Sequence, residues 1–156
     1  MLKFIRISFI VLVGLFLVIQ LVPYGRDHTN PVHKVEPNWD KPETRALAKR
    51  ACFDCHSNET VWPWYSHVAP VSWLVMKDVV NGRHELNFSE FDKPQDEADH
   101  AARMVERRKM PLKKYLPLHP EARLTAEEHD ALISGLKATL GVGKSERRPS
   151  LDELGD

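Results

Sequence analysis

Residues 52–56 read Cys52-Phe53-Asp54-Cys55-His56, and this C-x-x-C-H pattern decides how the rest of the chain is interpreted. The chain contains only these two cysteines in its 156 residues, so neither has another cysteine elsewhere to pair with. Two thiols at this spacing can each form a thioether with one vinyl group of a porphyrin, and the histidine that follows can bind the iron. The pentapeptide therefore predicts one covalently attached haem c per chain, with His56 as an iron ligand.

Three other interpretations of the same residues stay open. A thioredoxin-like redox pair is usually flanked by a βαβ pattern, which this sequence lacks. A structural zinc site needs four nitrogen or sulfur ligands, and no second cysteine pair is present, although the eight histidines could complete a mixed site. A structural disulfide between Cys52 and Cys55 is the plainest alternative.

The N-terminus predicts a membrane anchor. Lys3 and Arg6 precede an uncharged apolar run from Ile7 to Val22, which Phe4 and Ile5 extend to about the length of a membrane-spanning helix. Because no small-x-small cleavage site follows, we favour an uncleaved signal anchor over a removed signal peptide. The positive N-terminal end should stay cytoplasmic, so the haem domain is expected to face the periplasm or cell exterior from the bacterial cytoplasmic membrane.

The exported part should form one small helical domain. Its length allows a single core. Without Lys3 and Arg6 it has 20 basic residues against 22 acidic ones, which argues against nucleic-acid binding. We expect a signal anchor at 1–23, an extended tether at 24–39, a haem domain at 40–141 and a disordered tail at 142–156.

Helix start and stop signals predict an all-α fold. Asp40 and Glu43 suggest a capping box for a helix that runs into Cys52, with Pro42 in its first turn. Further helices are expected at about 71–80, closed by Asn81-Gly82, at about 95–109, and from a Thr125–Glu128 capping box to about residue 140.

Met110 is the candidate for the second axial ligand of the iron. It lies at the end of an expected helix, beside Pro111, where a loop could pass over the haem, and a thioether suits low-spin iron. Met110 could instead be core filler, as Met104 is expected to be. A histidine could also complete the site, and His67 is the strongest rival because it lies among aromatic residues close after the motif.

Four aromatic residues after the motif are candidate haem contacts. Large flat rings can wall a porphyrin, and their N–H or O–H groups can reach its propionates. They could equally be ordinary core. The four are Trp62, Trp64, Tyr65 and Trp73.

The motif and its surroundings resemble the bacterial haem-binding-domain family, which is related to single-haem cytochromes c. The resemblance covers about residues 38–140. Its residues are Cys52, Cys55-His56-Ser57-Asn58-Glu59-Thr60, Trp62-Pro63-Trp64-Tyr65-Ser66, Val68–Leu74, Gly82-Arg83, Leu86–Ser89, Met110-Pro111-Leu112, Tyr115, His119-Pro120 and Leu124-Thr125. The resemblance implies a cytochrome c-like fold with one haem c, His56 as proximal ligand and Met110 as distal ligand.

Two function classes follow. The first is a membrane-tethered electron carrier that exchanges single electrons with a redox partner protein. For this carrier the basic residues Arg107, Arg108, Lys109, Lys113 and Lys114 could form a docking surface or simply a solvated face. The second is a haem peroxidase or a gas or redox sensor with an open sixth site, in which His67 and Arg83 could act. We favour the non-catalytic carrier, because a sixth ligand is available.

Overall fold

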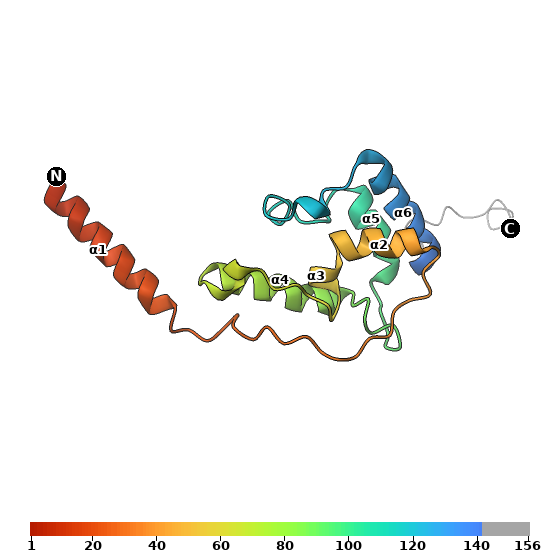
Figure 1. Ribbon diagram of the computed structural model, residues 1–156, viewed down its shortest axis with the longest axis horizontal. Coiled ribbons are helices and arrows are strands. Elements are labelled where there is room, and N and C mark those ends of the chain that lie inside the picture. The colour runs from red at the N-terminus through yellow and green to blue at the C-terminus, as the bar shows by residue number, and fades with distance from the viewer. Residues whose placement is uncertain (142–156) are drawn as a thin grey trace, which may run out of the picture.

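The apolar N-terminal segment forms a helix that stands away from the rest of the chain. In this computed structural model, which describes residues 1–141, α1 (Leu2–Ile19) has no buried residue and leads into a long connecting segment (Figure 1). By length and composition it could cross a membrane. An all-round apolar helix is unstable in water unless lipid or protein covers it, so α1 fits the predicted anchor. The expected disordered tail lies outside the described residues.

The remaining described residues form helices and connecting loops, and none of them belongs to a β-strand. The all-α prediction is therefore confirmed. After α1 come five α-helices and three short 3₁₀-helices: α2 (Pro42–Ala51), α3 (Phe53–His56), η1 (Trp64–His67), α4 (Val71–Glu85), η2 (Ala98–His100), α5 (Ala101–Glu106), η3 (Pro120–Ala122) and α6 (Ala126–Leu140).

The core lies where α2 and α5 pack against α6 (Figure 1). Leu132 and Leu136 are almost fully buried on one face of α6, and Ile133 and Leu140 pack beside them, as the helical spacing predicts. Gly135, on the same helix, lets α2 come close: a Cβ added there would collide with the Thr44 side chain.

The last helix has the boundaries expected from sequence. The Thr125 hydroxyl accepts a hydrogen bond from the Glu128 backbone, the Glu128 side chain accepts one from the Thr125 backbone, and Gly141 with φ +86° ends the helix.

Three other helix boundaries were predicted wrongly. Asp40 does not cap α2; its carboxylate accepts a hydrogen bond from Thr139 on α6, and Lys41 is the N-cap. The helix expected at 71–80 continues to Glu85. The one expected at 95–109 is replaced by η2 and α5; the Gln95 side chain bonds the backbone of residues 87 and 90, and Arg108, with φ +52°, lies beyond the end of α5.

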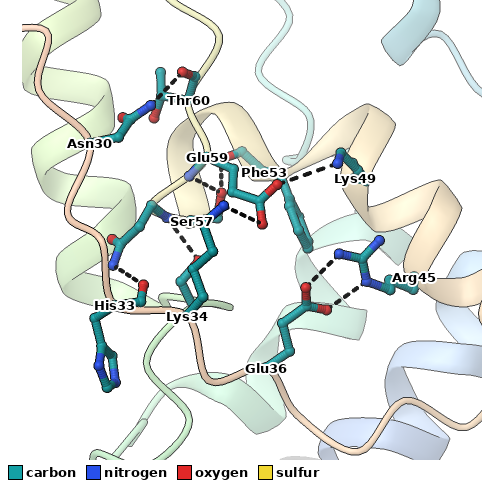
Figure 2. Close-up of polar contacts among 12 residues, drawn as sticks. Asn30, His33, Lys34, Glu36, Arg45, Lys49, Phe53, Ser57, Glu59 and Thr60 are labelled. Carbon is teal, nitrogen blue, oxygen red and sulfur yellow. Dashed lines mark hydrogen bonds and ion pairs between the residues drawn. The ribbon is translucent and has the colours of Figure 1, made fainter.

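The segment predicted as a tether, residues 24–39, is extended and lies along the domain. The Val35 and Phe91 amides form a parallel bridge pattern with the carbonyls of Ser89 and Val35, each at 2.8 Å. Figure 2 shows Glu36 bound by the Arg45 guanidinium on α2. Ordered contacts along its length therefore join this segment to the helical domain.

Candidate haem site

A cavity of about 450 Å³ lies beside the C-x-x-C-H motif, within the usual range of about 300–1,000 Å³ for small-molecule sites. Its walls come from the end of α2, from α3, from the second half of α4, from the η2–α5 region and from the loop after α5. The lining residues are Ala51, Cys52, Asp54, Cys55, His56, Asp78, Asn81, Gly82, Glu85, Leu86, Phe88, Glu97, His100, Ala101, Met104, Val105, Met110, Pro111, Leu112 and Tyr115.

Both cysteines and His56 line this cavity. The short helix α3 turns the chain so that the Cys55 and His56 amides both donate to the Cys52 carbonyl, at 3.1 and 2.9 Å. The two thiols are free rather than joined in a disulfide, and burial raises the pKa of each to about 12. They are thus protonated at neutral pH and face a shared cavity from neighbouring positions.

Two hydrogen bonds fix the position of His56. Its Nδ1 lies 3.0 Å from the Leu86 carbonyl oxygen, and its own carbonyl accepts from the Phe88 amide at 2.7 Å. Because a carbonyl oxygen can only accept, Nδ1 carries the proton and Nε2 keeps its lone pair. Burial lowers the pKa of the imidazole, while hydrogen bonds with the Leu86 and Gly82 backbone oppose that shift. His56 therefore presents Nε2 in the form that can bind a metal.

Gly82 brings α4 against the motif. A Cβ at this position would collide with the Cys55 carbonyl oxygen and lie 2.9 Å from the Cys55 carbonyl carbon and 3.0 Å from its Cβ. Since the neighbours are mostly backbone atoms, they cannot rotate away. Sequence reasoning placed this glycine at the end of a helix; in the structure it permits a helix to contact the Cys55 backbone.

Met110 also lines the cavity and is partly buried. The chain turns sharply after α5, because Arg108 has φ +52° and the Lys109 and Met110 amides both donate to the Met104 carbonyl, at 2.9 and 3.1 Å. Met104 lines the same cavity, although the sequence suggested only core filler. Two methionine sulfurs, those of Met104 and Met110, are therefore candidates for the second iron ligand.

The histidine that lines the cavity besides His56 is His100, not His67. His100 Nδ1 lies 2.7 Å from the Glu97 carboxylate, and both residues are part of the lining. His67 is exposed and meets His28 edge to face, with their ring centroids 4.3 Å apart. No sequence signal separated His100 from the other histidines, because only the fold brings η2 to the cavity.

None of the four aromatic residues predicted to contact haem is among the lining residues. Trp62 stacks on His28, Trp64 is 78% exposed, Tyr65 bonds His119 Nε2 at 2.6 Å, and Trp73 is partly buried elsewhere on α4.

The aromatic residues in the lining are Phe88 and Tyr115. The Tyr115 hydroxyl donates to the Asp54 carboxylate at 2.6 Å, and burial together with this bond raises the pKa of Tyr115. Tyr115 is thereby held to the middle of the C-x-x-C-H motif.

Comparison with protein families identifies the family of the chain. The model of the haem-binding-domain family matches residues 14–138, which is most of the chain. The chain belongs to the haem-binding-domain family. Its members are named for the cofactor, and haem is accordingly the group that this haem-binding domain must hold. No curated protein and no solved structure matches the chain.

The cavity of this haem-binding domain fits a haem chemically. Apolar side chains such as Leu86, Val105 and Leu112 can contact the porphyrin ring, and His56 Nε2 can bind iron. In the lining, the Asn81 side-chain amide can donate to a propionate oxygen, whereas the single Tyr115 hydroxyl proton is already donated to Asp54 and His100 Nδ1 is already paired with Glu97. Among residues 1–141, no group of three or more His, Cys, Asp or Glu is placed so that it could hold a bare metal ion.

Proposed function

We propose that the protein is a membrane-tethered mono-haem c-type cytochrome, which transfers single electrons on the outer side of the cytoplasmic membrane. The observation that carries this proposal is the lining of one apolar cavity by Cys52, Cys55 and an oriented His56, together with two methionine thioethers. Family membership supports haem as the occupant.

Each residue has a defined task in this proposal. Cys52 and Cys55 would hold the porphyrin through two thioether bonds, each formed by addition of an S–H across one vinyl group. His56 would bind the iron through Nε2, and Met110 would bind it through its sulfur. The haem, when bound, supplies a reversible one-electron couple, and a thioether ligand raises its potential.

The surface beside Met110 is proposed to receive the redox partner. Arg107, Arg108, Lys109 and Lys113 have exposed side chains, whereas Lys114 is paired with Asp78 at 2.8 Å. Four exposed cations next to the cavity favour an acidic partner and a transient, salt-dependent encounter. Replacing all four by glutamate should slow electron transfer most at low salt; an unchanged rate and salt dependence would remove the docking idea.

Absorption spectroscopy tests the central proposal. The full chain is produced with a cytochrome c maturation system and compared with Met110→Ala and, as the matched control, Met104→Ala. Haem that remains with the polypeptide after acid and solvent extraction indicates thioether attachment, whereas extractable haem contradicts it.

The charge-transfer band from sulfur to ferric iron identifies the distal ligand. We expect Met110→Ala to lose this band and Met104→Ala to keep it. The reverse result would make Met104 the ligand, and an unchanged low-spin spectrum in both variants would point to His100.

The alternative is a peroxidase or sensor with an open or labile sixth site. His100, hydrogen-bonded to Glu97 in the cavity, supports this alternative better than His67 or Arg83, because Arg83 is bound to the Ser57 carbonyl and to Thr60. Carbon monoxide separates the two classes: a six-coordinate carrier should bind it poorly in the ferrous state, and an open site should bind it readily.

A further inference from the structure

The junction between α1 and the helical domain is held by side-chain hydrogen bonds. Immediately after α1, the Gln20 amide donates to the Ala69 carbonyl and its oxygen accepts from the Ala69 amide, each at 2.9 Å. This pair closes a ring of two hydrogen bonds between the end of α1 and Ala69, two residues before α4 begins. The domain edge formed by η1 and the start of α4 is therefore next to the end of α1 (Figure 1).

The next residues extend this attachment. Gly25 has φ +79°, and a Cβ there would lie 2.7 Å from the Ser72 carbonyl oxygen, so its backbone contacts the first turn of α4. His28 Nε2 lies 3.1 Å from the Ser66 carbonyl oxygen, and the His28 ring stacks on Trp62 at 4.5 Å. These contacts restrict how far the same edge can move from α1.

Exposed apolar side chains gather on this edge. In residues 36–141, the exposed large hydrophobic residues are Val61, Trp64, Val71, Leu74, Val80 and Leu118. Four of these six lie between 61 and 74, on η1, on the loop before it and on the first turn of α4. Water-exposed Trp64 and Leu74, at 78% and 54%, would lose unfavourable contact with water if an apolar phase covered them.

Leu21 and Tyr24, which follow α1, are also exposed, at 79% and 52%. Exposed apolar residues thus occur both just after the helix that can span a membrane and on the domain edge to which Gln20 is hydrogen-bonded. Exposed Arg26 and Lys77 flank it and could pair with lipid phosphates.

We infer that Trp64, Val71 and Leu74 form a lipid-contacting surface, with which the domain rests on the headgroup region of the bilayer that α1 enters. This inference rests on the membrane anchor of the proposed function. Tryptophan and tyrosine favour that region of a membrane, because their rings are apolar and their N–H or O–H groups can reach water or headgroups. The molecule that we propose to cover this surface is phospholipid. The experiment below would also detect a protein bound there instead.

Such contact would hold the haem site at a set distance from the membrane. The residues of α4 that line the cavity are Asp78, Asn81, Gly82 and Glu85, in the second half of the helix. From Leu74 to Gly82 is eight residues, or about 12 Å along a helix. Lipid contact at the first turn of α4 would therefore lie about 12 Å along this helix from the residues that line the cavity.

Photocrosslinking of the full chain in bilayer discs tests the inference. The discs contain phosphatidylethanolamine and phosphatidylglycerol at about 3:1, an anionic mixture that can attract the flanking cations. A benzoylphenylalanine is placed singly at position 74 on the surface, at position 12 in α1, and at exposed position 131 on α6 as a control. Intact-mass spectrometry then counts lipid adducts.

We expect lipid adducts at positions 12 and 74 and none at 131, and loss of the adduct at 74 when Trp64→Ser and Val71→Ser are introduced. Adducts at 12 without any at 74 would overturn the lipid surface and leave the anchor intact. A protein adduct at 74 would also overturn it, in favour of a protein partner. Absence of adducts at 12 would show that the anchor itself fails, and the inference with it.

Discussion

Replacement of Gly82 by alanine should weaken both the fold and the haem site. An added Cβ would lie 2.9 Å from the Cys55 carbonyl carbon and closer still to its oxygen, whereas ordinary contacts begin at 3.4 Å, so α4 and the motif must separate by more than about 0.5 Å. Because the carbonyl belongs to the residue before His56, this movement should also displace the proximal ligand from the Leu86 carbonyl.

Two opposing terms set the size of the effect. Alanine inside a helix is favoured over glycine by about 1 kcal/mol. Overpacking against atoms that cannot rotate away costs about 1–3 kcal/mol. We therefore expect Gly82→Ala to lower the free energy of unfolding by up to about 2 kcal/mol, even though the substitution raises helix propensity.

Urea unfolding of the full chain in detergent measures this change, with the Soret band reporting the haem site and circular dichroism reporting the helices. Gly14→Ala is the matched control, because a Cβ at Gly14 meets nothing within 4 Å. Gly82→Ala should lower the urea midpoint and alter the ligand bands, and Gly14→Ala should do neither. A Gly82→Ala protein with wild-type stability and an unchanged spectrum would refute the close contact between α4 and Cys55.

Three further changes test how α2 and α6 are held together. Gly135→Ala should destabilise the protein in urea, and adding Thr44→Ala should restore part of the loss, because the collision at Gly135 is with the Thr44 side chain. Leu132→Ala, at a fully buried site, should cost about 2–5 kcal/mol in the same assay, and a smaller loss would contradict its place in the core. Hydrogen bonds from the Arg50 guanidinium, and then from the Thr125 amide, lower the pKa of Glu128 from 4.5 to about 2. The stabilisation from the ionised Glu128 is therefore present above pH 4.5 and is lost as the pH falls towards 2. Glu128→Gln, which can keep the capping box, should therefore be less stable than wild type at pH 7 and equal to it near pH 2, and a constant difference across this range would contradict the assignment.

The family and its cofactor were accessible from the sequence because they depend on local chemistry. The C-x-x-C-H pentapeptide places two thiols and an imidazole within five residues, whatever the surrounding fold. The helix from Thr125 and the apolar helix at the N-terminus were predicted for the same reason: capping groups and apolar runs act between residues that are close along the chain.

The composition of the cavity wall depended on the tertiary structure. Trp62 and Trp73 follow the motif closely, yet they lie outside the lining, whereas Tyr115, sixty positions after Cys55, is bound to Asp54 inside the motif. Closeness along the chain predicts contact only within one helix or turn, and packing of separate elements decides the rest.

The sequence by itself therefore determined the C-x-x-C-H motif, the apolar N-terminal helix and the all-α class, because each depends on side chains that act over a few residues. Only the tertiary structure decided which groups surround the motif. The carbonyl that orients His56 is the backbone carbonyl of Leu86. Every residue has such a group, so its role could not be predicted from the side chains. Gly82 contacts the motif because α4 packs against α3, and Met104 and His100 line the shared cavity because the fold brings α5 and η2 to it. Such packing depends on the whole core rather than on any one segment.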